Sequence, residues 1–246
     1  MKSVRLAVLP FALVAPLLVG ACGDSPSDAS TSLTPTSAAT ERGGMAGHDA
    51  GLPDGDYEAT LHPLNPAVQD HTGPVGVAHG KAYFSVRNGQ FTATVNAEGV
   101  QQGMIHPEHI HSAANCPPAS ADVNHDGFVD VIEGVPFYGP ILIPLDDHLA
   151  SQASGTFPTA NGVRGLLRYM SSTSLAAMLA DLNAADPDPT DAVVKLGGAP
   201  LALETRHVVL HGVDATTTLP SSVASLPGVP AYLTLPIACG EIRRVR

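Results

Sequence analysis

The stretch Lys81-Ala-Tyr-Phe-Ser-Val-Arg87-Asn88-Gly89-Gln90-Phe-Thr-Ala-Thr-Val95 is typical of a β-hairpin. Two runs rich in aromatic and β-branched residues flank Asn-Gly, the dipeptide that best fits a two-residue hairpin turn. Alternation along the first run places Phe84 and Val86 on one face and Tyr83, Ser85 and Arg87 on the other. The hairpin therefore predicts an antiparallel sheet.

Other segments extend this pattern on both sides of the hairpin. One convincing helix is predicted over 174–185, because Leu175, Met178, Leu179 and Leu182 recur at helical spacing and Thr173 can cap the N-terminus. Short strands between Gly- and Pro-rich turns predict a mainly β fold, an antiparallel β-sandwich or barrel with one short helix in a long connection. The further predicted strands are 56–61, 105–111, 140–145, 206–212 and 231–242.

Composition excludes several classes of protein. The chain has 246 residues, of which 44% are hydrophobic, 14% charged and 4% aromatic, with 24 Gly and 22 Pro. A coiled coil or helical bundle would need more Glu, Lys and Leu at helical spacing. The formal net charge of −11 excludes a nucleic-acid partner, because a phosphate-binding surface needs excess positive charge.

The N-terminal segment is typical of an export signal. Lys2 and Arg5 precede an apolar run that is short for a bilayer span. The run ends in Val19-Gly-Ala-Cys22, which resembles the lipobox of bacterial lipoproteins, where cleavage before the Cys leaves a lipid-bearing N-terminal residue. We therefore expect a signal peptide over 1–21, lipidation of Cys22, and a membrane-anchored protein of the bacterial cell envelope, facing the periplasm or the cell surface. The alternative is ordinary secretion with a free Cys22.

A flexible tether is expected between the anchor and the folded part. Residues 22–55 are mostly Ser, Thr, Ala, Pro, Gly and Asp, with almost nothing to bury. Removal of the signal peptide also removes two basic residues, so the mature chain keeps 10 basic and 23 acidic side chains. One acidic β-domain is predicted over 56–246.

The three cysteines divide into one anchor and one pair. With Cys22 assigned to lipid, Cys116 and Cys239 are the remaining thiols in an oxidising compartment. A disulfide between them is the simplest interpretation. The alternative, a metal site with two thiolates, lacks the close Cys spacing of such sites.

A calcium-binding loop is predicted over 122–133. The segment Asp122-Val-Asn-His-Asp-Gly-Phe-Val-Asp-Val-Ile-Glu133 matches the EF-hand loop at every side-chain position, including the Gly of the sharp turn. The expected calcium ligands are Asp122, Asn124, Asp126, the Phe128 carbonyl, Asp130 (directly or through water) and Glu133.

The flanks of this loop differ from those of a calcium sensor. Pro117-Pro118 lie where an entering helix would be, and Gly134 and Pro136 are expected to cut short an exiting one. We therefore predict a static, structural calcium site, since sensors report binding by helix reorientation. An acidic Asp/Gly turn without an ion is the alternative.

A second site is suggested by histidines. In the segment His106-Pro-Glu-His109-Ile-His111, an extended backbone would project His109 and His111 from one strand face. His211 follows a hundred residues later. Imidazole nitrogens suit copper or zinc rather than calcium, so this site would be separate from the loop. The alternative is that these are ordinary packed or surface histidines.

Three short stretches resemble the copper/zinc superoxide dismutase family. They are Gly103-Met-Ile-His-Pro-Glu-His-Ile-His111 with Cys116 soon after, Arg206-His-Val-Val-Leu-His211, and Ala238-Cys-Gly-Glu-Ile242. The resemblance implies a Greek-key β-barrel, copper bound by His109, His111 and His211, a supporting role for His106, and a Cys116–Cys239 disulfide. It also implies superoxide as a small-anion substrate, with copper alternating between two oxidation states.

The departures from that family are as informative. Where the family has a histidine shared by copper and zinc and then a zinc cluster, this chain has the calcium-type loop, so no zinc site is evident. His125, inside the loop, is the nearest candidate for a fourth copper ligand. Pro236 stands where the family has its active-site arginine, which removes a cation that would attract superoxide.

A related resemblance predicts a different function. His-Ile-His with a terminal Gly240-Glu-Ile-Arg243 is also similar to chordin-type (CHRD) repeat domains of secreted bacterial proteins, which have no assigned redox chemistry. The expected function is an envelope-anchored protein that binds copper and a structural calcium and that dismutates superoxide if it is an enzyme. The alternative is a non-catalytic, calcium-stabilised envelope or adhesion module.

Overall fold

The computed structural model describes residues 52–69, 76–153, 155–162, 164–189 and 192–246. The elements below all belong to one compact unit. The expected signal peptide, the lipidation site Cys22 and nearly all of the expected tether lie outside the described residues.

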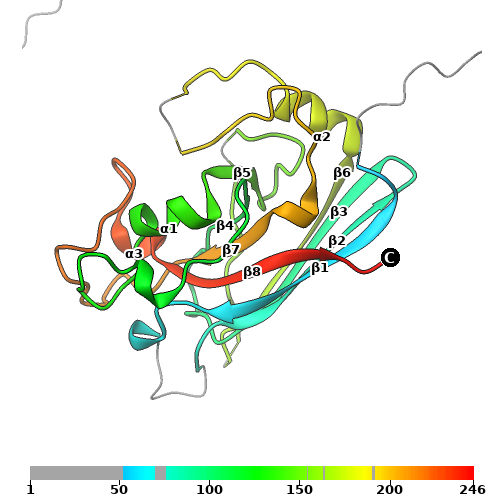
Figure 1. Cartoon of the computed structure of the whole chain (residues 1–246). Coiled ribbons are helices and arrows are strands. Elements are labelled where there is room, and N and C mark those ends of the chain that lie inside the picture. The colour runs from blue at the N-terminus through cyan, green and yellow to red at the C-terminus, as the bar shows by residue number, and fades with distance from the viewer. Residues whose placement is uncertain (1–51, 70–75, 154, 163, 190–191) are drawn as a thin grey trace, which may run out of the picture. The chain divides into compact units, whose positions relative to one another are not determined.

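Eight antiparallel strands form one curled sheet in the order β5-β4-β7-β8-β1-β2-β3-β6 (Figure 1). The mainly β, antiparallel fold expected from the sequence is therefore confirmed. After β3 the chain crosses to the far part of the sheet to form β4, and after β5 it crosses back to form β6, as in Greek-key folds. The strands are β1 Gly55–Pro63, β2 His79–Arg87, β3 Gln90–Glu98, β4 Glu108–His111, β5 Ile141–Pro144, β6 Leu167–Ser174, β7 His207–His211 and β8 Pro236–Arg244.

The predicted hairpin is present as β2 and β3. Arg87 pairs with Gln90, and the two turn residues have the positive φ angles of a type I′ turn, 50° for Asn88 and 74° for Gly89. Phe84 and Val86 are buried, and Arg87 is exposed. The two faces of this strand are thus the ones that the alternation predicted.

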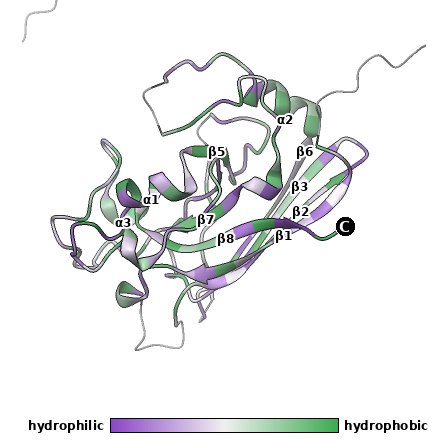
Figure 2. Cartoon of the chain, in the orientation of Figure 1, coloured by the Kyte–Doolittle hydropathy of each residue, from purple (hydrophilic) through white to green (hydrophobic). Residues whose placement is uncertain are grey.

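The hydrophobic core takes residues from strands across the whole sheet, from β5 at one edge to β6 at the other. Figure 2 shows hydrophobic and hydrophilic residues alternating along the long strands, because each strand turns one face inward. A single hydrophobic cluster includes Phe84, Phe91, Ile110, Leu142, Val208 and Ile242.

Two predicted strands are shorter than expected. The 105–111 segment forms a strand only from Glu108, and Ile105 makes an isolated bridge to Thr159. The 231–242 segment divides into helix α3, Ala231–Thr234, and strand β8, which begins at Pro236. Proline has no N–H to donate to a ladder, so the first residue of a strand is one of the positions it tolerates.

Strand β6 is missing from the sequence-based prediction. Its Arg-Tyr-Met-Ser-Ser-Thr-Ser run is polar, yet Leu167 and Tyr169 are buried and alternate with exposed Arg168 and Met170. Eight residues of β6 pair in continuous register with β3. The short alternation of Leu167 to Met170 is the feature of the sequence that indicates this strand. Hydrogen bonding to β3 stabilises the polar remainder of β6.

The predicted helix is present but shorter. Helix α2 covers Leu175–Leu182, and its N-cap is Ser174, whose hydroxyl accepts from the Ala177 N–H at 3.3 Å, in place of the expected Thr173. Thr173 instead pairs with Phe91 in the sheet. The structure also has three short 3-10 turns, Pro66–Val68, Ala119–Ala121 and Leu203–Thr205.

The helix that leaves the calcium-type loop is not cut short at Gly134 or Pro136, contrary to the sequence-based expectation. Helix α1, Val131–Tyr138, begins directly after Asp130 and contains both expected breakers. Gly134 leaves the space that the ring of buried Tyr138 fills. Pro136 is exposed and costs the helix one internal hydrogen bond, which the strong cap at its N-terminus offsets.

None of the helices in the described ranges is long and apolar enough to cross a membrane.

Candidate metal centre

Three buried histidines from two neighbouring strands converge on one point. His109 and His111 lie two residues apart on β4, and His211 ends the adjacent strand β7. The ring centroids are 5.5 Å apart for His109 and His111, 5.3 Å for His109 and His211, and 5.8 Å for His111 and His211. One nitrogen of each ring lies within 4.8 Å of those of the other two. The sequence-predicted group is thus brought together, and it could hold a metal ion.

Backbone carbonyls orient two of the three rings. His111 Nδ1 donates to the Gly139 carbonyl at 2.8 Å, and His211 Nδ1 donates to the Thr234 carbonyl at 2.7 Å. A neutral imidazole has one N–H, so each of these bonds leaves Nε2 with a free lone pair. Such second-sphere contacts are the usual means of fixing the tautomer of a metal-binding histidine.

One buried nitrogen of each ring has no hydrogen-bond partner among the described residues. His109 Nδ1, His111 Nε2 and His211 Nε2 are buried and make no hydrogen bond with any described residue. Leaving a buried polar atom unpaired is costly, and native structures rarely do so without a functional reason. Three such atoms in one cluster fit the donor set of a metal ion bound through imidazole nitrogen.

The environment keeps these rings neutral. Burial lowers the pKa of His111 to about 3 and that of His211 to about 4, and it lowers the pKa of His109 well below its ordinary value. The neighbouring imidazoles lower the pKa of His109 and of His111 further, because a second positive charge in the cluster is unfavourable. Only the neutral ring can bind a metal, so the cluster is in its binding-competent form at neutral pH.

Local irregularities place His211 in the cluster. The register of β7 against β8 shifts between Leu210 and His211, and the His211 N–H donates to the Pro107 carbonyl at 2.8 Å. The ring of buried His106 lies between two carbonyls, with Nδ1 3.0 Å from that of His211 and Nε2 2.7 Å from that of Gln101. His106 thus contacts the backbone at His211 and at Gln101 through its two ring nitrogens.

A cavity of about 310 Å³ opens beside the three histidines. Its walls come from helix α1, from the segment around α3, and from Phe157, whose ring packs edge-on against His109 at 5.1 Å. Among the described residues that line it, none is Asp, Glu, Lys or Arg. The lining consists of Ile105, Pro107, His109, His111, Val131, Val135, Gly139, Pro140, Ile141, Phe157, Ala192, His211, Leu226, Val229, Leu233 and Thr234.

Pro236 and Arg206, two positions mentioned with the family resemblance, both lie away from the role of a cation in the cavity. Pro236 is buried at the start of β8, where it pairs with His211. The Arg206 guanidinium donates to the backbone carbonyls of Ser112, Leu201 and Pro200. Neither residue supplies a cation to the cavity.

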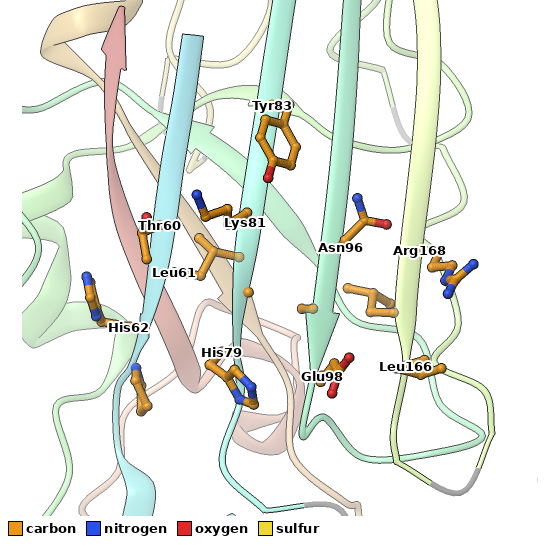
Figure 3. A pocket seen from close by; sticks show the side chains of 14 residues that line it. Thr60, Leu61, His62, His79, Lys81, Tyr83, Asn96, Glu98, Leu166 and Arg168 are labelled. Atoms are coloured by element: carbon orange, nitrogen blue, oxygen red, sulfur yellow. The ribbon is translucent and has the colours of Figure 1, made fainter. Parts of the chain in front are cut away.

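A larger but shallower hollow lies on the outer face of β1, β2, β3 and β6 (Figure 3). It measures about 610 Å³, and its lining mixes apolar residues with the charged side chains of Lys81, Glu98 and Arg168. His62 and His79 border it. Within the described residues, these two histidines belong to no group of three metal-ligand side chains.

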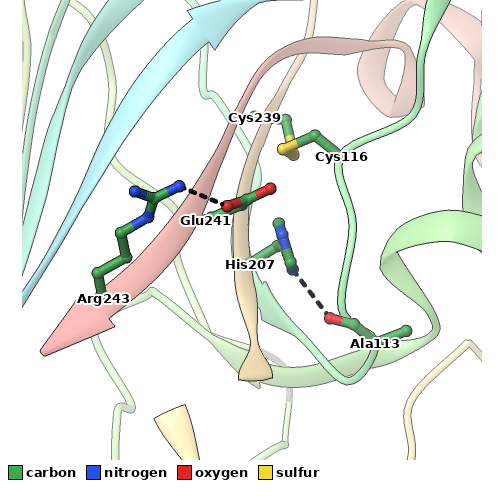
Figure 4. The surroundings of a disulfide bond; sticks show 6 residues. All are labelled: Ala113, Cys116, His207, Cys239, Glu241 and Arg243. Atoms are coloured by element: carbon green, nitrogen blue, oxygen red, sulfur yellow. Dashed lines mark hydrogen bonds and ion pairs between the residues drawn. A yellow bond between two sulfur atoms is a disulfide. The ribbon is translucent and has the colours of Figure 1, made fainter. Parts of the chain in front are cut away.

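The Cys116–Cys239 disulfide is present (Figure 4). It joins residues 123 positions apart and links the segment after β4 to the middle of β8, with a Cα–Cα distance of 5.9 Å. Nearby, His207 Nδ1 donates to the Ala113 carbonyl at 2.9 Å. The disulfide and this hydrogen bond both hold the segment that leads from β4 to the calcium-type loop.

The calcium-type loop is folded by its own side chains. Asp122 accepts from the N–H groups of Asp126 and Gly127 at 3.1 and 3.0 Å, and Asp126 accepts from the Phe128 N–H at 3.0 Å. Asn124 also accepts from the Asp126 N–H, at 2.9 Å. These bonds curl the loop. One buried oxygen, Asp126 Oδ2, has no hydrogen-bond partner among the described residues.

The last two predicted calcium ligands cap helix α1. Asp130 accepts from the N–H groups of Ile132 and Glu133, while Glu133 accepts from the Asp130 N–H at 3.2 Å, which is a capping box. Glu133 also accepts from the N–H groups of Val123 and Asn124. In the part of the chain that is described, the loop carboxylates do not form a group of three within 4.8 Å, and calcium there stays a prediction.

His125, the candidate for a fourth copper ligand, lies exposed in the loop with a φ of 59°. It is outside the three-histidine group. The fourth place of the loop takes a left-handed backbone conformation and turns its side chain to solvent, which is the usual position for this residue in such loops. The structure does not bring His125 to the candidate copper site.

Some features of the site carry no residue-type signal in the sequence. The carbonyls of Gly139 and Thr234 act through the main chain, and the cavity walls come from segments scattered between 105 and 234. Glu108 is also unexpected: it faces the core, and burial raises the pKa of its carboxyl well above the usual range, which favours the uncharged form.

No protein-family model matches this sequence, and no curated protein matches it.

Proposed function

We propose that this protein binds copper through His109, His111 and His211 as a lipid-anchored protein of the bacterial cell envelope. The observation that carries the proposal is the set of three buried, unpartnered imidazole nitrogens that converge from β4 and β7. Neutral imidazoles without a thiolate or carboxylate suit copper or zinc, and copper forms the stronger complexes with nitrogen ligands. The envelope location rests on the lipobox-like segment at Cys22.

Bound copper would supply a one-electron redox couple at the floor of the cavity. The protein's own contribution is to hold three neutral rings in place and to shield them from bulk water. Superoxide dismutation, the activity that the resemblance implies, is the reaction to assay first. The described lining residues include no cation that would draw a small anion inward, so we expect any dismutation to be slow.

The test is metal analysis of histidine variants. We expect the full-length protein to take up one copper per chain, and His109→Gln and His211→Gln to lose that copper while circular dichroism shows an intact fold. His62→Gln, an exposed histidine on the outer face, is the matched control and should keep its copper.

Unchanged copper content in both ligand variants would overturn the proposal. It would then favour the non-catalytic envelope module. Zinc uptake that excludes copper under competition would overturn the choice of metal and leave the three-histidine site in place.

A further inference from the structure

The cavity beside the histidines has a chemistry that differs from that of an anion channel. Its described lining is aliphatic and aromatic apart from the three imidazoles and Thr234. In the metal-free protein, a small anion entering it would lose water and meet no compensating charge from the described lining residues. The chain as a whole carries a net charge of −11, which opposes anions further.

Apolar residues continue to the rim of the cavity. Ile105 is 39% exposed and Val229 is 37% exposed, and both line the cavity. Large hydrophobic side chains at a concave surface are typical of ligand sites, where they take up the apolar part of the ligand. The entrance is thus suited to an uncharged molecule.

The polar side chains of the described lining are the three imidazoles and Thr234. The unpartnered nitrogens of His109, His111 and His211 gather at one point, buried by more than nine-tenths. A volume of about 310 Å³ is at the small end of ligand pockets and has room for a ring-sized molecule. The arrangement is one apolar chamber with a single point of coordination.

We propose that this cavity binds a small, neutral organic molecule whose apolar body fills the chamber and whose one nitrogen or oxygen donor reaches the metal. The inference rests on the proposed copper site for the donor contact. The apolar contact is independent of the metal, because its walls are Leu226, Val229, Leu233 and their neighbours.

The first experiment compares two probes that share a donor and differ in apolar surface. Imidazole and 4-phenylimidazole are titrated separately into the copper-loaded, full-length protein, and the copper absorption band and electron paramagnetic resonance spectrum are followed. We expect 4-phenylimidazole to half-saturate at a concentration roughly tenfold or more below that of imidazole, because the phenyl ring leaves water for the apolar chamber. Equal half-saturation concentrations with copper retained would overturn the inference.

A pair of valine variants tests the location. Val229→Asp places a charge at the rim of the cavity, and Val245→Asp places one at a valine that is 51% exposed and does not line it. We expect the half-saturation concentration of 4-phenylimidazole to rise toward that of imidazole in Val229→Asp and to stay unchanged in Val245→Asp. A preference that survives Val229→Asp would contradict the assigned chamber.

A metal-free arm separates this inference from the proposed function. In the apo protein, 4-phenylimidazole should shift the methyl NMR signals of Val229 and Leu233 and leave that of Val245 unchanged. Shifts in a protein that takes up no copper would contradict the copper proposal and support the apolar binding site. Copper uptake without these shifts would support the copper proposal and contradict the apolar binding site.

Discussion

At the scale of single residues, the site depends on which nitrogen of each histidine is free. The carbonyls of Gly139 and Thr234 accept hydrogen bonds from the Nδ1–H groups of His111 and His211. The lone pairs on Nε2 therefore turn toward the cluster. His109 is held differently, by its edge-on contact with Phe157 and with the other two rings. The cluster is thus preorganised in part by groups outside the three candidate ligands, namely the two carbonyls and Phe157.

The first prediction concerns the pH dependence of the apo protein. Folding lowers the pKa of His111 to about 3 and that of His211 to about 4, against about 6.5 in the unfolded chain. Above pH 6.5 both histidines are neutral in the folded and in the unfolded chain, so their contribution to the free energy of unfolding is fully present. Between pH 6.5 and 4 the unfolded state binds more protons, so each of these histidines should cost up to about 1.4 kcal/mol of stability per pH unit as the pH falls.

Urea unfolding of the apo protein at several pH values checks this slope. In His211→Gln the free energy of unfolding should change less steeply with pH, by the equivalent of about one bound proton. His62→Gln, at an exposed position, should leave this slope unchanged. A slope that is the same in both variants would show that the buried rings do not titrate in this way.

At the scale of elements, the calcium-type loop is continuous with helix α1, and helix α1 forms one wall of the cavity. Asp130 caps α1, and its second oxygen accepts from the Ala224 N–H on the segment that leads to α3. Val131 and Val135 of the same helix line the cavity. Gly139, the residue after the helix, orients His111 through its carbonyl. The loop therefore supports the histidine site although it lies outside it.

The second prediction tests calcium in this loop. Glu133→Gln keeps one acceptor oxygen for the capping box but loses the carboxylate of the twelfth loop position. With calcium at about 100 times its dissociation constant, we expect the variant to be less stable than the wild type by about 2 to 3 kcal/mol, the stabilisation that binding would supply. Thermal unfolding in calcium measures the loss.

Chelator supplies the control for this experiment. In excess EGTA the wild type and Glu133→Gln should unfold within about 1 kcal/mol of each other, because only the weakened cap then separates them. The same difference with and without calcium would mean that Glu133 acts as a cap alone.

At the scale of the whole molecule, the disulfide joins distant parts of the chain. Cys116 follows β4 and Cys239 lies in β8, on the other side of β7 in the sheet order. The bond closes a loop of more than a hundred residues that contains the calcium-type loop, α1, β5, β6 and β7. It therefore constrains most of the elements that build the cavity.

The third prediction is the stability that this bond provides. On the chain-entropy model, closure of so long a loop restricts the unfolded state by about 4 to 5 kcal/mol. The double variant Cys116→Ser with Cys239→Ser should lose about that much in urea unfolding. Cys22→Ser should be as stable as the wild type. A double variant of unchanged stability would contradict the entropic contribution.

The fourth prediction concerns the anchor. Cys22→Ser should release the protein from the membrane fraction into the soluble fraction, because a lipobox without its cysteine cannot be lipidated. The double variant Cys116→Ser with Cys239→Ser should stay with the membrane. Fractionation and immunoblotting check both, and continued membrane retention of Cys22→Ser would exclude lipidation as the anchor.

Local chemistry alone was enough to predict much of the fold and of the site. The Asn88-Gly89 turn determined a hairpin because few other dipeptides adopt its two positive φ angles readily. His109 and His111 share a face because side chains in any strand alternate. The Cys116–Cys239 pairing followed from counting the thiols available in an oxidising compartment.

Other elements depended on partners that are distant in the chain. Polar strand β6 gains its stability from the ladder with β3, and α1 tolerates Gly134 and Pro136 because Tyr138 and the capping box hold it. A local pattern cannot report such contacts, since the partners come together only when the chain folds.

The environment of the histidines was also decided by the tertiary structure. The sequence by itself determined which residue types could bind a metal and that two of them share a strand face. Only the folded sheet placed β7 beside β4, turned two backbone carbonyls toward the rings and enclosed an uncharged cavity next to them. The physical reason is that burial, desolvation and main-chain hydrogen bonds are properties of an arrangement in space, and no single residue carries them.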